Sequence, residues 1–160
     1  MNTLNEITIR KASESDIDAI FNLLSIYAAK GLLLPPCKKN ISSRLNTFIV
    51  AEFNLEVIAS ASLRDFDNNL FEVRSLAVSQ KYAGKQIGSK LVSYLLNEFK
   101  IPPGSRVFAL TYRSTFFERL GFKCVPKKLF PEKIWHDCEN CPKKEHCDEQ
   151  AVMLTTAIQE

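Results

Sequence analysis

The sequence predicts one domain, residues 1–160, of the α/β (α+β) class, with helices layered on a central sheet. Three observations support this fold class. A chain of 160 residues is long enough for one domain with a sizeable core. A hydrophobic share of 46% and a charged share of 24% are typical of a globular protein. Strand patterns and helix patterns also alternate along the chain, which favours a three-layer arrangement.

The elements of the first half each have a local signal. Apolar residues at helical spacing predict a helix that begins after Ser13 or Ser15: Ile17, Ile20, Phe21, Leu24 and Tyr27. Gly31 fits the end of that helix. The other elements expected here are a strand at 7–11, a short helix at 38–45, and strands at 47–52 and 57–64.

In the second half, turn and break signals separate the elements. Asp67-Asn68-Asn69 is a turn, Pro102-Pro103-Gly104 forces a break, and Ser114 is expected to cap a short helix that ends at Gly121. The elements expected are strands at 70–78, 106–111, 122–125 and 151–157, and helices at 87–99 and 115–120. A cysteine-containing loop occupies residues 131–150.

The segment 73–88, VRSLAVSQKYAGKQIG, is the most informative stretch of the chain. It predicts a strand, a loop with Gly84 and Gly88, and the start of a helix. A helix start presents unpaired N–H groups and a positive dipole end, and glycines allow an anion to approach the backbone. The segment therefore suits a pyrophosphate. A plain tight turn explains the two glycines equally well.

The wider sequence resembles the GCN5-related N-acetyltransferase (GNAT) family. SLAV precedes the loop and FFERLGF follows it at 116–122. The family's loop pattern is Gln/Arg-x-x-Gly-x-Gly/Ala, where Ala83 and Gln86 of this chain depart from the usual residues. The resemblance implies a mostly antiparallel central sheet that is splayed between strands four and five, with acetyl-CoA in the splay.

The resemblance also implies which residues bind acetyl-CoA. Main-chain groups of the strand before the loop, those of Leu76, Ala77 and Val78, are expected to hold pantetheine and polarise the thioester, while their side chains belong to the core. The loop and helix start are expected to bind the pyrophosphate through these residues: Ala83, Gly84, Lys85, Gln86, Ile87, Gly88 and Ser89.

Strand alternation places Glu72 and Arg74 on one face, opposite Phe71 and Val73. Glu72 is the candidate base that accepts the amine proton, directly or through water. Arg74 is a candidate for binding a substrate carboxylate through two parallel hydrogen bonds. The plain alternative for both residues is a local ion pair, or contact with solvent for Glu72.

The family's general acid is a Tyr four residues before a Gly-Phe pair, and this chain has Phe117 at that position. Tyr112, at the end of the preceding strand, is the expected substitute. Its alternative is a half-buried tyrosine that caps the core. Arg113 follows at the strand-to-helix turn and is a second candidate carboxylate binder, with an ordinary surface arginine as its alternative.

The tail carries Cys138, Cys141 and Cys147 in a C-x2-C-x5-C arrangement. A structural zinc site needs about four ligands, and three other residues are candidates for the fourth: His136, His146 and Cys124. A second C-x2-C pair is absent, so a packed loop of reduced cysteines is preferred to zinc, and the metal is left open.

A narrower resemblance covers nearly the whole chain. AAKGLLLP at 28–35, RSLAV at 74–78, FALTY at 108–112 and IWHDCENCP in the tail resemble the short bacterial N-acetylglutamate synthases, which are amino-acid N-acetyltransferases of arginine biosynthesis. That resemblance implies L-glutamate as acceptor. Lys30 is then expected to meet an acidic side chain. Lys38 stands near the place where those enzymes carry an Arg.

Charge and composition limit the partners. The net charge of +3 is mild and the basic residues are scattered, which does not favour nucleic acid. The N-terminus shows no signal peptide or membrane span, so a cytoplasmic location and no membrane partner are expected, with the five cysteines as thiols or ligands. The expected partners are small molecules, acetyl-CoA and an amino acid; the oligomeric state, a homodimer included, is left open.

Three other hypotheses remain at this point. In the first, the fold and donor are the same but the acceptor is an amine other than glutamate, although Arg74 and Arg113 favour an acceptor that carries negative charge. In the second, the chain is a degenerate acyl-CoA-binding regulatory module without catalytic activity, which would explain why Ala83, Gln86 and Phe117 depart from the family pattern. In the third, the cysteine tail is a zinc module that binds protein or nucleic acid. This hypothesis would leave the glycine-containing loop at 83–88 unexplained.

Overall fold

The computed structural model describes residues 6–67, 69–99, 101–126 and 150–155. Two compact units share the chain. The first contains residues 1–65 and 73–101, and the second contains residues 66–72 and 102–160. Strand β4, Leu70–Val78, contributes to both, since its first three residues belong to the second unit. The single domain expected from the sequence stays a prediction.

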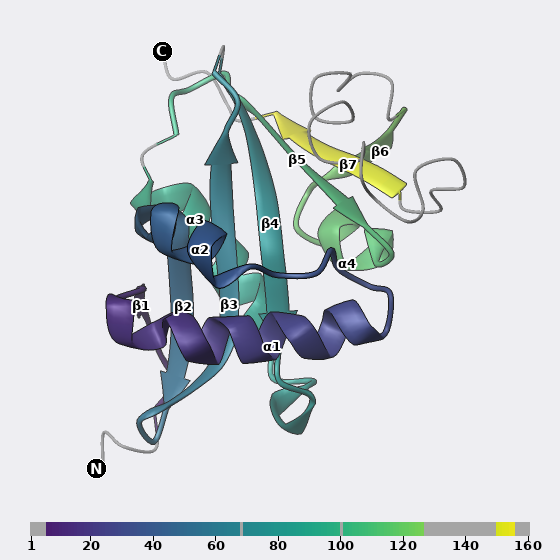
Figure 1. The fold of residues 1–160 in the computed structure, drawn as a ribbon. Coiled ribbons are helices and arrows are strands. Elements are labelled where there is room, and N and C mark those ends of the chain that lie inside the picture. Colours follow the sequence, from purple (N-terminus) through teal and green to yellow (C-terminus); the bar gives the residue numbers. More distant parts are fainter. Residues whose placement is uncertain (1–5, 68, 100, 127–149, 156–160) are drawn as a thin grey trace. The chain divides into compact units, whose positions relative to one another are not determined.

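The first unit is a sheet with helices on two faces. Figure 1 shows α1 crossing in front of the strands and α3 behind them. Its elements in chain order, besides the end of β4, are β1 (Thr8–Lys11), η2 (Glu14–Asp16), α1 (Ile17–Ala29), α2 (Lys38–Ser43), η3 (Leu45–Thr47), β2 (Phe48–Phe53), β3 (Glu56–Asp65), η4 (Gln80–Tyr82) and α3 (Ile87–Glu98).

The core of the first unit lies on both faces of β3. Strands β1, β2 and β3 pair antiparallel, and both α1 and α3 contact β3. Six consecutive residues of β3, from 58 to 63, are therefore buried. On the helices, the fully buried contributors include Ile20 of α1 and Leu91 and Leu95 of α3. Burial of apolar residues on both faces of β3 stabilises the first unit.

The second unit contains the start of β4, β5 (Arg106–Thr111), α4 (Ser114–Glu118), β6 (Lys123–Val125) and β7 (Gln150–Thr155). β4 pairs parallel with β5, with Leu70, Phe71 and Glu72 opposite Arg106, Val107 and Phe108. β5 and β6 pair antiparallel with β7. The complete strand order is β1-β2-β3-β4-β5-β7-β6. The predicted mixed, mostly antiparallel sheet is confirmed.

Most elements agree with the sequence prediction, and two details were wrong. The strands at 70–78 and 106–111 have the predicted bounds. Ser114 does not cap α4, because the chain already turns at Arg113, whose N–H donates to Thr111 Oγ1 at 2.8 Å. In α1, Leu23 is buried although the pattern omitted it, while Ile17, Phe21 and Tyr27 are half-buried.

Other helix and strand ends shift by one to three residues. α2 ends at Ser43, and a separate 3-10 turn, η3, follows it before β2. No helix of the described residues is long and apolar enough to cross a membrane.

Candidate active site

The end of β4 leads into a short exposed loop before α3. β4 ends at Val78, and the Ser79 N–H donates to the Ile58 carbonyl at 2.8 Å, which holds the chain against β3. After η4, residues 83–86 are exposed, and Ile87, only 2% exposed, begins α3. The strand–loop–helix arrangement predicted at 73–88 is therefore present within the first unit.

Two left-handed residues shape this loop. Gly84 has a φ of 81°, and no heavy atom of the described residues lies within 4 Å of where its Cβ would be. Gln86 has a φ of 60° and occupies the N-cap of α3 without a side-chain capping hydrogen bond. A residue with a Cβ is strained in this region, so the side chain of Gln86 makes the backbone of the loop less favourable than a glycine would. Gly88 and Ser89 lie half-buried in the first turn of the helix.

The start of α3 suits an anion for three reasons. The helix has 12 residues, so its dipole places partial positive charge at this end. Its first N–H groups receive no capping acceptor from Gln86. Two lysines also stand beside the loop, since the ammonium groups of Lys81 and Lys85 lie 5.8 and 5.9 Å from the ring centre of Tyr82. The sequence prediction did not include Lys81 among the residues near the pyrophosphate. Its position became clear only from the structure, where it lies in η4 with its ammonium over the Tyr82 ring.

Main-chain groups of β4 precede the loop. Ala77 is buried and belongs to the core as expected, whereas Leu76 and Val78 are only half-buried. The Val78 carbonyl accepts a hydrogen bond from the Tyr27 hydroxyl of α1. A carbonyl oxygen has two lone pairs, so this bond leaves the Val78 oxygen able to accept a second one.

Two basic candidates lie in the first unit. Arg74 is half-buried on β4. Lys30 is exposed at the C-cap of α1, and its ammonium lies 5.6 Å from the ring centre of Tyr27. Because Lys30 is exposed, its ammonium is accessible from solvent.

The second unit contains the other three candidates. Glu72 is only 3% exposed and pairs in register with Phe108, so of the two alternatives to a catalytic base, contact with solvent was wrong. Tyr112 is half-buried after β5, and Arg113 is exposed at the N-cap of α4. Phe117 is 4% exposed and packs edge-on against Phe116 and Phe122, so the position of the family's acid belongs to the core here.

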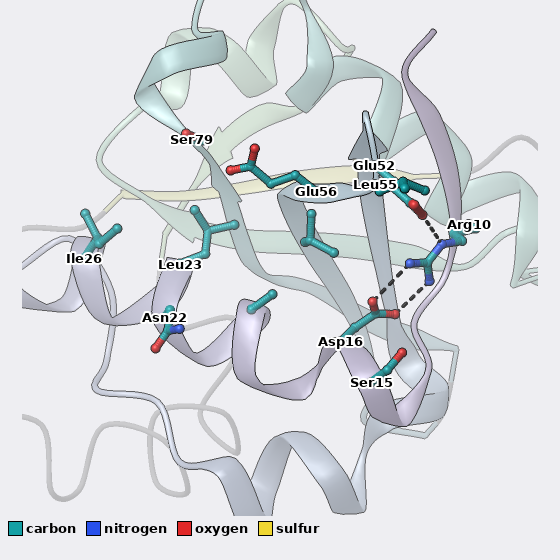
Figure 2. A pocket seen from close by; sticks show the side chains of 12 residues that line it. Arg10, Ser15, Asp16, Asn22, Leu23, Ile26, Glu52, Leu55, Glu56 and Ser79 are labelled. Carbon is teal, nitrogen blue, oxygen red and sulfur yellow. Dashed lines mark hydrogen bonds and ion pairs between the residues drawn. The ribbon is translucent and has the colours of Figure 1, made fainter. Parts of the chain in front are cut away.

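A separate hollow of about 640 Å³ lies in the first unit and contains none of the predicted site residues (Figure 2). Arg10 lies at one side of the hollow and donates to Asp16 at 2.7 Å and to Glu52 at 2.9 Å. The hydrogen bonds from Arg10 hold the pKa of Asp16 below its ordinary value, against the opposite effect of burial. Asp16 also accepts from the Ser13 N–H in a capping box. The ion pair between Arg10 and Asp16 therefore connects β1 to the start of α1.

The cysteine prediction lies mainly outside the described residues, as Cys138, Cys141, Cys147, His136 and His146 all fall at 127–149. Cys124 is described: it is exposed, and its thiol donates to Glu118 at 3.2 Å. Within the described ranges, no group of three or more His, Cys, Asp or Glu residues is arranged to hold a metal ion.

The comparison with protein families matches residues 44–124 to the acetyltransferase (GNAT) domain. The chain belongs to the GNAT acetyltransferase family. This GNAT protein is an acetyl-CoA-dependent N-acetyltransferase, and acetyl-CoA is its co-substrate. The residues at the α3 start fit that molecule, because the open space at Gly84, the uncapped amides and the two lysines all favour a pyrophosphate.

Individual relatives agree with this assignment. The chain is 37% identical to an uncharacterized N-acetyltransferase of Chlorobaculum tepidum, over 92% of this chain and 95% of that one. It is 33% identical to an amino-acid acetyltransferase of Mycobacterium tuberculosis, over 71% of this chain and 67% of that one.

Among solved structures, the N-acetylglutamate synthase of Neisseria gonorrhoeae, complexed with coenzyme A and N-acetyl-glutamate, has the same fold. The TM-score is 0.83 at 21% identity, over 94% of this chain. The GNAT chain spans 35% of the length of that synthase.

Proposed function

We propose that this GNAT enzyme is an amino-acid N-acetyltransferase of the cytoplasm that acetylates the α-amine of L-glutamate. The product, N-acetylglutamate, would enter arginine biosynthesis. The observation that carries the proposal is the similarity to an amino-acid acetyltransferase over 71% of the chain. The basic residues Lys30, Arg74 and Arg113 support it, because an acceptor with two carboxylates needs cations to bind it.

The donor is proposed to bind along β4 and the α3 start. Backbone groups of Leu76, Ala77 and Val78 would hold the pantetheine arm and polarise the thioester carbonyl. The loop from Ala83 to Gln86, with Ile87, Gly88 and Ser89 at the helix start, would bind the pyrophosphate through its amides. Lys81 and Lys85 add positive charge beside it.

The reaction we propose is direct attack of the neutral amine on the thioester carbon. A C–N bond forms, the C–S bond breaks, and the CoA thiolate takes up a proton. Glu72 would accept the amine proton, and since Glu72 is buried, transfer through a water molecule is the form that its position favours. Tyr112 would supply the proton for the thiolate. Half-burial leaves part of its side chain accessible for that role.

The acceptor's carboxylates are proposed to bind to Arg74 and Arg113, with Lys30 as a further cation. Arg113 is well suited, because it is exposed at the start of α4 and its guanidinium forms two parallel hydrogen bonds to a carboxylate. Removing such a charge-assisted contact costs roughly 1.5–3 kcal/mol of binding free energy.

The test is a panel of amino acids and amines with acetyl-CoA, and mass spectrometry to identify the acetylated products. We expect N-acetylglutamate as the main product, with glutamine and aspartate acetylated more slowly. Mass detection avoids thiol dyes, which would react with the exposed Cys37 and Cys124. A faster reaction with a polyamine or with lysine would overturn the glutamate assignment, and an absence of any product would favour a binding module.

A further inference from the structure

β4 contains one residue whose backbone conformation a regular strand does not adopt. Ser75 has a φ of 53°, in the middle of the strand that runs from Leu70 to Val78. Residues other than glycine rarely occupy this left-handed region, and they stay in it only where the surrounding structure fixes the backbone. The strained residue lies directly before Leu76, where the proposed thioester contacts begin.

Three side-chain hydroxyls from other elements hold the carbonyls of this stretch. Ser60 donates to the Ser75 carbonyl at 3.1 Å and Ser62 donates to the Arg74 carbonyl at 3.3 Å. Tyr27 of α1 donates to the Val78 carbonyl. Ser60 and Ser62 are two residues apart on β3, so their side chains share one face of the strand. The three residues are called the hydroxyl clamp below.

The sheet does not need serine at these positions for packing. Ser60 is 0% exposed and Ser62 is 5% exposed, in a run of β3 whose other members are Ile58, Ala59, Ala61 and Leu63. A buried hydroxyl is costly unless it is hydrogen-bonded, whereas alanine at the same position has no such cost. The hydroxyls are therefore explained by the carbonyls they bind, and those carbonyls belong to the distorted part of β4.

We infer that Tyr27, Ser60 and Ser62 are positioning residues of the acetyl transfer. They fix the backbone from Arg74 to Val78 so that its groups meet the thioester arm in a reactive geometry. This inference rests on the proposed placement of the thioester along Leu76–Val78. A displacement on the order of 1 Å in the position of a reacting group lowers turnover by up to about 100-fold, so even a small relaxation of β4 is measurable.

The experiment compares Ser60→Ala, Ser62→Ala, Tyr27→Phe and the triple variant with the wild-type enzyme. Turnover is measured on the best acceptor of the amino-acid panel, and the Kd values of CoA and acetyl-CoA by calorimetry. We expect turnover to fall about threefold in each single variant and at least tenfold in the triple variant. The Kd of CoA should stay within threefold, because the pyrophosphate loop is unchanged. The preference for acetyl-CoA over CoA should also decrease.

Ser105→Ala is the matched control, since the Ser105 hydroxyl is also buried and donates to a backbone carbonyl, but to that of Pro102 at 2.6 Å and not to one of Arg74–Val78. It should lower the melting temperature as much as Ser60→Ala does, with turnover unchanged. Ser62→Thr keeps the hydroxyl and should restore turnover relative to Ser62→Ala. A folded triple or single variant with wild-type turnover and wild-type preference for acetyl-CoA would overturn the inference.

Two further variants keep the test decisive if the triple variant does not fold. Ser75→Gly accepts the left-handed conformation and should keep turnover, while Ser75→Val opposes it and should lower turnover. Equal turnover in these two would also contradict the clamp. The clamp results do not depend on glutamate, because any acceptor found by the panel serves, and the CoA affinities need no acceptor.

Discussion

Two strand-to-helix turns of this GNAT enzyme, one in each unit, are built in different ways. The turn after β4 is an exposed loop with left-handed residues, and it feeds the 12-residue helix α3. The turn after β5 passes directly through Tyr112 and Arg113 into α4, which has five residues and a buried Phe117. Both turns start a helix, yet only the first offers backbone amides at the end of a long dipole.

The difference shows why the two turns suit different chemistry. A long helix with an uncapped start and open space at Gly84 binds an anion through its backbone, which tolerates changes in side chains. A helix of five residues has a small dipole, so any anion recognition at the second turn depends on the Arg113 side chain itself. This difference agrees with the proposal that the pyrophosphate binds at the first turn and an acceptor carboxylate at the second.

The largest effect is expected from Gly84→Asp. Aspartate tolerates the left-handed conformation better than most residues, so the fold should survive, while the new carboxylate fills the open space and repels a pyrophosphate. The affinity for acetyl-CoA, measured by calorimetry, should fall by roughly 100-fold, about 2.7 kcal/mol.

Gly121→Asp is the control for that variant. Gly121 follows α4 with a φ of 97°, so the strain is similar but the position lies at the second turn's helix. Its acetyl-CoA affinity should equal that of the wild type. Equal losses of affinity in both variants would mean that strain alone, and not contact with the pyrophosphate, explains the effect at Gly84.

Arg113→Ala should raise the KM of the acceptor by roughly 10- to 100-fold, in line with the loss of one charge-assisted contact of about 1.5–3 kcal/mol. The KM of acetyl-CoA should change little, and steady-state kinetics with both substrates varied separates the two. Arg119→Ala removes another exposed arginine of the same short helix and should leave both constants unchanged. A matching rise in both KM values would remove Arg113 from acceptor recognition.

Phe117→Tyr restores the residue that the family resemblance expects as general acid. Phe117 is buried between Phe116 and Phe122, so the added hydroxyl should cost about 1–3 kcal/mol of unfolding free energy without raising kcat. Denaturant unfolding measures the free energy of unfolding, and turnover at saturating substrate measures kcat. A gain in kcat would show that this position reaches the thiolate after all, and Tyr112 would lose its proposed role.

The smallest effect is expected from Gln86→Gly, which removes the Cβ at a φ of 60°. Relief of that strain, about 1 kcal/mol, should tighten acetyl-CoA binding severalfold or raise the melting temperature by a few degrees. Leu55→Gly is the matched control: Leu55 has a φ of 66° and is 82% exposed in the β2–β3 turn. Leu55→Gly should raise the melting temperature and leave the affinity for acetyl-CoA unchanged. If Gln86→Gly weakened acetyl-CoA binding, the glutamine side chain itself would be a ligand.

The parts of the candidate site that depend on a local sequence pattern could be predicted from the sequence. The loop at 83–88 lies between a strand and a helix whose periodicities differ, and glycine marked the point where the chain turns left-handed. The burial of Glu72 and Phe117 could not be predicted in this way, because strand alternation gives only two faces and does not say what covers each of them. The position of the Lys81 ammonium beside the loop was also not predicted, since it depends on how that side chain lies over the ring of Tyr82.

By itself, the sequence determined the order of strands and helices, the GNAT resemblance and the loop that suits a pyrophosphate. These features depend on local periodicity and on residues with special backbone freedom, which are readable along the chain. Only the tertiary structure decided that Ser75 is left-handed and that Tyr27, Ser60 and Ser62 hold the carbonyls of β4. Those bonds join residues 12 to 51 positions apart. Long-range hydrogen bonds of this kind depend on how α1 and β3 pack against β4, which no local pattern encodes.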